Sequence, residues 1–336
     1  MRIVHRLSAL ALLALASAAL AQQPAAITLP DLNPSEWFDG KMGGTFGAKT
    51  VTAFAKTNRV AIAGFRVVYV THNEAHAMVR ATYLPGGVET GSARSKMEVD
   101  LKGVDDATLQ AITDRAYQRF VEQLKAAGRE VVTPGAFTAF KVATVPQDVN
   151  TGPLRGKAFS PAGLPLWWQV GDAWGDAGLG QKNMRAFNQM SESLQAPITI
   201  APQIVVDFAH MGSSGNHSGL IQRSAEVSAS LAMSIPTFNT RVVRAEQTRY
   251  GGIVFKGDDG ALAMTKTLDT DVEFATMRKV DEKSGRVINL TGPDSKSKKW
   301  LNAAETTNEA YSAAADAVLA EATGAFAKLF AANPAK

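Results

Sequence analysis

The strictest hydrophobic pattern in the chain is an alternation of apolar and polar positions over residues 223–236. Every second position from Ala225 to Ile235 is apolar, and serine fills most of the positions between them. Because successive side chains of a β-strand point to opposite faces, this pattern predicts a long strand with one buried face. Residues 237–240 are predicted to form the turn into a hairpin partner that begins at Arg241.

Other segments have the composition of strands without this strict alternation. They are rich in valine, isoleucine and aromatic residues, which favour strands, and several are apolar on both faces, as buried strands are. These segments are residues 59–70, 129–134 and 202–211, with further extended pieces over 261–280.

The clearest helical period covers residues 105–127. Its apolar residues recur at spacings of three and four, which is the period of one helix face. Asp105 and Asp106 stand at the start, where a helix favours acids, and Gly128 stands just past the end, where a left-handed cap is favoured. The predicted buried positions are Leu109, Ile112, Ala116, Phe120 and Leu124.

Two further helices are predicted from the same period. Residues 181–195 place Met184, Phe187 and Leu194 on one side. The alanine-rich segment 301–330 places four larger or apolar residues on one face, namely Tyr311, Val318, Ala322 and Phe326.

Strands and helices are interspersed, which predicts an α+β or α/β fold with a single mixed sheet and flanking helices. Residues 59–332 are expected to form one globular domain, after a lead-in over residues 22–58. An irregular insertion is expected around residues 134–180, because this stretch is rich in proline, glycine and tryptophan.

The first 21 residues are expected to be a signal peptide. A short basic start precedes an apolar run, and Ala19 and Ala21 supply the small residues that signal peptidase reads. Cleavage after Ala21 would place the chain in a bacterial periplasm or the medium. The apolar run is short for a membrane span and no later stretch approaches that length, so no transmembrane helix is expected after cleavage.

Composition narrows the function classes. The chain has no cysteine, which argues against a disulfide framework and against a lipid anchor attached through cysteine. Its net charge of +4 is too small to point to nucleic acid. The glycines do not form a phosphate-binding loop, and no cofactor is expected.

His72, Glu74 and His76 fall within five positions. If the preceding strand continues, all three side chains share one face, and two imidazoles with a carboxylate could bind zinc or copper. Asn73 stands where a helical zinc-protease motif needs glutamate. Neighbours on one face of a strand lie ~7 Å apart, which is wide for one ion. A metal site and a polar strand end therefore both stay open.

Residues 207–219 carry the residue types of a hydrolase, but the nucleophile-elbow spacing is missing. Glycines and serines between two strands are also ordinary loop residues. No catalytic residue is therefore predicted. The residues concerned are Asp207, His210, Ser213, Ser214 and His217.

Trp167, Trp168 and Trp174 lie in the irregular stretch. Tryptophans on a loop can grip a partner or a ligand, because they supply contact area at little cost in entropy. The alternative is that they hold the loop onto the core.

The order of elements, with the stretch AITDRAYQRFVEQLKAAGREVV at residues 111–132, resembles a family of periplasmic α/β domains. The family includes the periplasmic domain of the curli secretion channel CsgG, the N-terminal domain of TolB and the LpoB-type lipoproteins. The resemblance implies a non-enzymatic cell-envelope protein that binds an envelope partner or assembles with itself, with a link to outer-membrane assembly or secretion. The competing hypotheses are a periplasmic protein that binds an apolar or glycan ligand, and a hydrolase.

Overall fold

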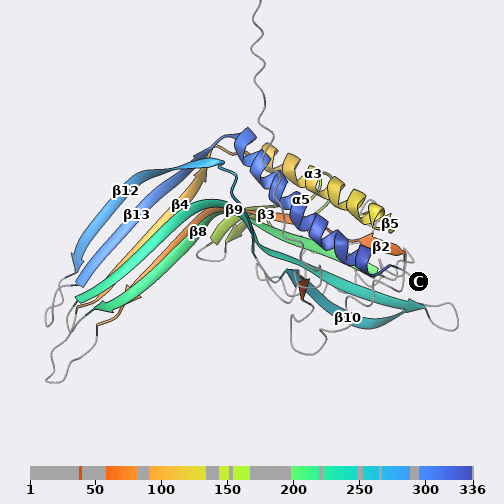
Figure 1. Ribbon diagram of the computed structural model, residues 1–336, viewed down its shortest axis with the longest axis horizontal. Coiled ribbons are helices and arrows are strands. Elements are labelled where there is room, and N and C mark those ends of the chain that lie inside the picture. Colours follow the sequence, from red (N-terminus) through yellow and green to blue (C-terminus); the bar gives the residue numbers. More distant parts are fainter. Residues whose placement is uncertain are drawn as a thin grey trace, which may run out of the picture.

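Two helices cover one face of a large mixed sheet, and part of the sheet continues well beyond them as a projecting arm (Figure 1). The computed structural model describes residues 38–39, 58–81, 91–133, 144–150, 154–166, 198–218, 222–247, 253–264, 267–287 and 295–334. Strands make up most of these residues, and the structure is therefore a mixed α/β protein, as the sequence predicted.

The elements follow one another in this order along the chain: β1 (Phe38–Asp39), β2 (Arg59–Ile62), β3 (Arg66–Val79), β4 (Ala93–Lys102), α3 (Asp106–Ala126), β5 (Glu130–Val132), β6 (Asp148–Asn150), β7 (Leu154–Phe159), β8 (Ile198–Ser218), β9 (Gln222–Gln247), β10 (Ile253–Met264), β11 (Leu268–Thr270), β12 (Ala275–Val287), β13 (Ser295–Thr306) and α5 (Asn308–Ala332).

The main path of the sheet runs β1-β10-β9-β8-β3-β4-β13-β12. Strands β2 and β3 both lie parallel to β8, one after the other, and β4 lies parallel to β13. The pairs β8–β9, β9–β10, β3–β4 and β12–β13 are antiparallel. The predicted strand at 59–70 is thus two strands, interrupted at residues 63–65.

Helix α3 confirms the prediction for residues 105–127. Asp105 caps it, since its side chain accepts a hydrogen bond from the Thr108 backbone nitrogen at 2.7 Å. Gly128 ends it with a φ of +81°, a conformation that glycine adopts without strain. All five predicted core positions are buried.

The core lies between the helices and the sheet and is rich in phenylalanine. The Phe120 ring packs against Phe65 at 5.7 Å and against Phe326 of α5 at 5.6 Å between ring centroids. Phe326 also stacks on Phe238 of β9 at 5.2 Å. This cluster joins both helices to the sheet.

Helix α5 begins later than the sequence predicted. Residues 301–306 belong to β13, which pairs with β4 on one side and β12 on the other. The helix prediction was wrong there, because pairing on both edges overrode the helical propensity of Leu301 to Ala304. The predicted face of Tyr311, Val318, Ala322 and Phe326 is buried.

The insertion expected around 134–180 is not irregular throughout. Residues 148–159 contain β6 and β7, and β7 pairs with β3. Gly156 permits this pairing, because a Cβ atom there would lie 2.3 Å from the Tyr69 carbonyl oxygen. The predicted helix at 181–195 lies outside the described residues.

The predicted turn at Thr237–Thr240 is also wrong, because β9 runs through it without interruption. The pairing with β8 loses register beside Pro236, between the pairs Val205–Thr237 and Asp207–Ser234. Proline cannot donate to the ladder and is tolerated at such a bulge. The strand predicted from the alternation over 223–236 is confirmed.

Within the described residues, neither helix is long and apolar enough to cross a membrane.

Candidate functional site: the projecting arm

The arm consists of the outer parts of β3, β4, β8 and β9 together with the hairpin β12–β13, and we define it as residues 72–79, 93–102, 207–235, 275–287 and 295–306 as far as they are described. One layer runs β3-β4-β13-β12, and the hairpin β8–β9 packs across it as a second layer. Figure 1 shows the arm descending on one side of the molecule and the helix-covered part on the other.

Small side chains let the two layers approach closely. Ala75, Ala77, Ala93 and Ser95 are all buried between them. The Ser95 hydroxyl donates to the backbone carbonyl oxygen of Ala225 on the opposite layer. A hydrogen bond from a side chain to the facing backbone requires such close packing, which larger residues would prevent.

Asp207 lies where the two layers separate. Strand β3 pairs with β8 only as far as the register pair Tyr69–Val206. From His72 onward, β3 pairs with β4. One carboxylate oxygen of Asp207 accepts from the backbone nitrogens of Phe208 at 2.7 Å and Ala209 at 3.2 Å.

The same oxygen accepts from Asn73 Nδ2 at 2.8 Å, which ties the other layer to this point. Burial raises the pKa of the Asp207 carboxyl above its ordinary value, although these hydrogen bonds oppose the effect. Asp207 therefore satisfies backbone groups that have left the sheet ladder.

The predicted common face of His72, Glu74 and His76 carries a ladder of ion pairs. Glu74 lies between the two histidines, with Oε1 2.9 Å from His76 Nε2 and Oε2 3.9 Å from His72 Nε2. Lys96 Nζ, from β4, lies 2.7 Å from Glu74 Oε2. His72 Nδ1 lies 2.6 Å from Asp100 Oδ1, also on β4.

The ladder continues across the next strand. Lys96 also contacts Glu98 at 2.7 Å, and Lys299 of β13 reaches the same carboxylate at 3.1 Å. Burial would raise the pKa of Glu74, but the hydrogen bonds from Lys96 and His76 outweigh it and lower that pKa to about 2. Glu74 is 12% exposed, so its charge is held by these partners more than by water.

Replacing Glu74 with glutamine is expected to lower the free energy of unfolding by about 2 kcal/mol at pH 7. This is less than the full change in the Glu74 pKa, from 4.5 to about 2, would imply, because solvent screens the ion pairs. The folded pKa lies below the unfolded one, so this stability is present above pH 4.5 and is lost as the pH falls towards 2. Urea titrations of both proteins across this range should therefore converge at low pH. The control is Glu226→Gln, on the exposed face of β9, which should change the free energy of unfolding by less than about 0.5 kcal/mol. A difference between Glu74→Gln and the original protein that stays constant with pH would contradict the role of the ladder.

The geometry bears on the metal hypothesis. Among the described residues, no group of three or more His, Asp or Glu side chains is placed to hold a metal ion. In the ladder, Lys96 takes a position beside Glu74 that a cation would need. The expected strand end is wrong, because the strand continues through all three residues to Val79, and the contacts are those of a polar face within a strand.

The residues with hydrolase-like chemistry lie on β8 and not in a loop. Asp207 contacts the backbone and Asn73, whereas His210 Nε2 lies 2.9 Å from Asp269 Oδ1. Ser213 and Ser214 are exposed along the strand, and the His217 side chain lies outside the described residues. The expected loop is therefore wrong, because pairing with β9 extends as far as Ser218.

Trp167, Trp168 and Trp174, the predicted contact residues, lie outside the described part of the chain. The prediction of extended structure over 261–280 covers the start of β12, Ala275–Val287, but the place of this strand at the outer edge of the arm was not predicted. Strand β12 pairs with β13, and among the described residues no strand pairs with its other edge. The mixed charge of residues 278–283 was the available signal, because such charges are typical of exposed edge strands.

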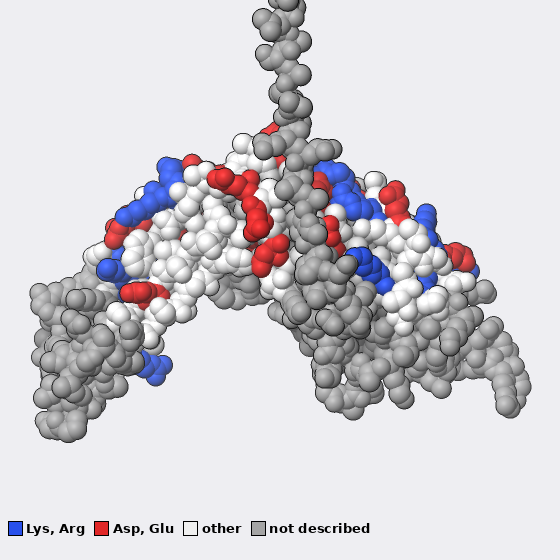
Figure 2. Space-filling model, viewed as in Figure 1, with Lys and Arg blue, Asp and Glu red and all other residues white. Residues whose placement is uncertain are grey.

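Strand β12 has two features that discourage unwanted pairing at an exposed sheet edge, a bulge and charged side chains. Val280 is a bulged residue, without a partner between the pairs of Lys279 and Asp281, and its side chain is 50% exposed. Charged side chains flank it, including Arg278, whose Nη2 lies 2.6 Å from Glu305. Figure 2 shows positive and negative side chains intermixed over this part of the arm.

No protein-family model, curated protein sequence or solved structure matches the chain.

Proposed function

We propose that this protein is an exported, non-enzymatic cell-envelope protein that acts by binding an envelope partner or a second copy of itself, in a process linked to outer-membrane assembly or secretion. The observation that carries the proposal is the outer edge of β12, with which no described strand pairs, on an arm that projects from the helix-covered core. An edge strand presents unpaired backbone donors and acceptors that a strand of another chain can use.

The length and support of β12 favour a binding role. The strand has 13 residues and lies on a hairpin whose other strand is held by β4 over ten register pairs. A supported edge is already in the conformation that an added strand needs, so binding costs little ordering entropy.

The charges along β12 favour selective binding. Lys279 pairs with Glu282, and Lys283 Nζ lies 3.6 Å from Asp281. Such charges and the bulge at Val280 discourage pairing with arbitrary strands, whereas a partner of complementary charge can replace these exposed ion pairs.

Val280→Pro tests the proposal, because proline is tolerated at bulges and removes a backbone donor from β12. We expect native mass spectrometry and light scattering to show an assembly, or a complex with an envelope protein cross-linked through a photoreactive residue at the exposed position 276 of β12, which the original protein and both variants carry. The proline variant should reduce that species at least about tenfold, as the loss of roughly 1.4 kcal/mol would.

Val280→Ala is the matched control, because it shortens the same side chain and keeps the backbone donor. It should assemble or cross-link as the original protein does, and both variants should retain the circular dichroism spectrum. A monomer that forms no cross-link in envelope extract, or equal complex formation by the proline variant, would contradict the proposal.

A further inference from the structure

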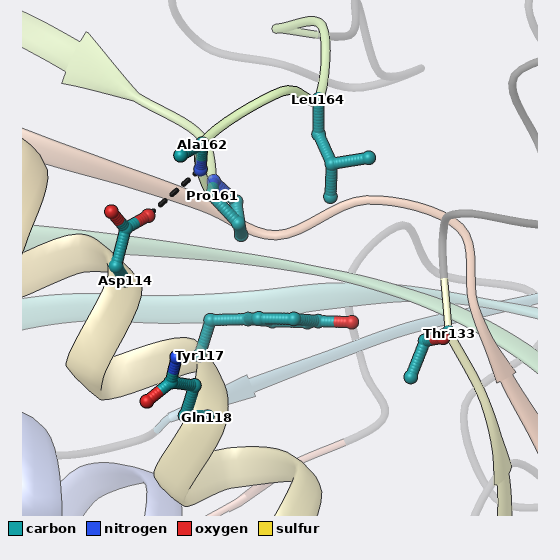
Figure 3. A pocket seen from close by; sticks show the side chains of 7 residues that line it. All are labelled: Asp114, Tyr117, Gln118, Thr133, Pro161, Ala162 and Leu164. Atoms are coloured by element: carbon teal, nitrogen blue, oxygen red, sulfur yellow. Dashed lines mark hydrogen bonds between the residues drawn. The ribbon is translucent and has the colours of Figure 1, made fainter.

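A cavity of about 390 Å³ lies beside α3, on the helix-covered side of the molecule and away from the arm. Among the residues that the structure describes, its walls come from one side of α3, the turn after β7 and the end of β5. Figure 3 shows the Tyr117 ring on one side of the space, with Pro161 and Leu164 across from it. The volume is within the range of small-molecule sites.

Tyr117 provides a flat wall with an unsatisfied polar end. Its ring packs edge-on against Phe65, with centroids 5.5 Å apart. The hydroxyl oxygen is buried and has no hydrogen-bond partner among the described residues, and Figure 3 shows it directed towards Thr133 at the end of the cavity. Buried tyrosine hydroxyls usually have a partner, and because Tyr117 lines the cavity, a group of a bound ligand can supply one here.

Hydrogen-bonding groups surround the apolar wall. Asp114 Oδ1 accepts from the Ala162 backbone nitrogen at 2.8 Å and from Gln110 Nε2 at 3.0 Å. Both bonds end on one oxygen, and among the described residues no donor contacts Oδ2. Gln118 and Thr133 add an amide and a hydroxyl to the lining, so donors and acceptors are both present.

We propose that this cavity binds a saccharide ring, with one apolar face of the ring against Tyr117 and its hydroxyls on Asp114, Gln118 and Thr133. A sugar ring has a flat face of C–H groups and a rim of hydroxyls that donate and accept. That distribution matches one aromatic wall within a polar rim. A purely apolar ligand would leave the polar rim and the Tyr117 hydroxyl unpaired, which costs affinity.

This proposal does not rest on the proposed role of the arm, because the cavity and β12 share no residue. The test is saturation-transfer NMR and calorimetry with three disaccharides, namely chitobiose, cellobiose and maltose, and with indole as an apolar probe. We expect at least one disaccharide to bind and to receive saturation on its C–H face, and indole to bind more weakly.

Tyr117→Phe keeps the ring and removes the hydroxyl. It should weaken disaccharide binding roughly three- to tenfold, while the unliganded protein stays equally stable or gains stability, since an unsatisfied buried group is removed. Thr133→Val should weaken binding to a similar degree. Tyr311→Phe is the matched control, because the Tyr311 hydroxyl is also buried without a partner but lies in the core, and binding should not change.

Absence of binding by all three disaccharides would overturn the proposal, as would tighter binding of indole than of any of them. Equal affinity for Tyr117→Phe and the original protein would also overturn it. Any of these results would leave the edge-strand proposal untouched, which the Val280 variants test separately.

Discussion

Replacing Phe120 with alanine is expected to lower the free energy of unfolding by about 3–5 kcal/mol. Phe120 is fully buried and packs against Phe65 and Phe326, so its loss leaves a cavity where α3, α5 and the sheet meet. Phe65 lies between β2 and β3 and Phe326 lies on α5, so the two neighbouring rings are held by different segments and cannot both move into the space. Urea denaturation followed by circular dichroism measures the change.

Glu122→Ala provides the control for Phe120→Ala. Glu122 lies on the exposed side of the same helix, and its replacement should change the free energy of unfolding by less than about 0.5 kcal/mol. A loss below about 1 kcal/mol for Phe120→Ala would show that the helix does not pack against the sheet in this way.

Replacing Asp207 with alanine is expected to cost about 2–4 kcal/mol, because the backbone nitrogens of Phe208 and Ala209 lose an acceptor where β8 leaves β3. Asn73 loses its contact to the same oxygen. The effect should be largest in the arm, so hydrogen exchange of β8 and β9 beyond Asp207 should accelerate more than that of α3.

Asp207→Asn is the matched variant, because it keeps an oxygen acceptor and removes the charge. The folded pKa of Asp207 is raised, so its contribution to stability is fully present below its unfolded pKa, ~3.9, and is lost as the pH rises through the folded value. The free energy of unfolding of Asp207→Asn should therefore increase relative to that of the original protein as the pH rises. An equal loss for both substitutions, without pH dependence, would mean that Asp207 does not hold the branch point.

Glu74 and Asp207, which both lie in the arm, are thus expected to respond to pH in opposite directions. Glu74 stabilises the folded state as an anion, because Lys96 and His76 hold its charge. Asp207 is destabilised as an anion, because the loss of water on burial outweighs the hydrogen bonds from Asn73, Phe208 and Ala209. Both side chains end in a carboxyl group, and the surroundings of each decide whether its pKa is raised or lowered.

The face shared by His72, Glu74 and His76 could be predicted from sequence, because it follows from the alternation of side chains along a single strand. Their partners could not. Lys96 and Asp100 come from β4, and their positions depend on the register between β3 and β4. A shift of one residue would have turned these charges to the other face.

Helix α3 and the buried face of α5 were determined by local sequence. Their apolar periods, the cap at Asp105 and the glycine at 128 act within a few residues, and the structure contains each of them. The alternation that predicted the strand at 223–236 is equally local. Interactions over so short a range can be recognised without knowing the rest of the fold.

Only the tertiary structure decided where the strands end and which edge stays open. Residues 301–306 became a strand and not a helix because β4 and β12 lie on either side, and residues 154–159 became a strand because Gly156 fits against Tyr69. The arm, the open edge of β12 and the cavity beside Tyr117 all combine segments distant in sequence. Hydrogen bonds between strands join residues far apart in the chain, so the pattern of one segment does not specify its neighbour.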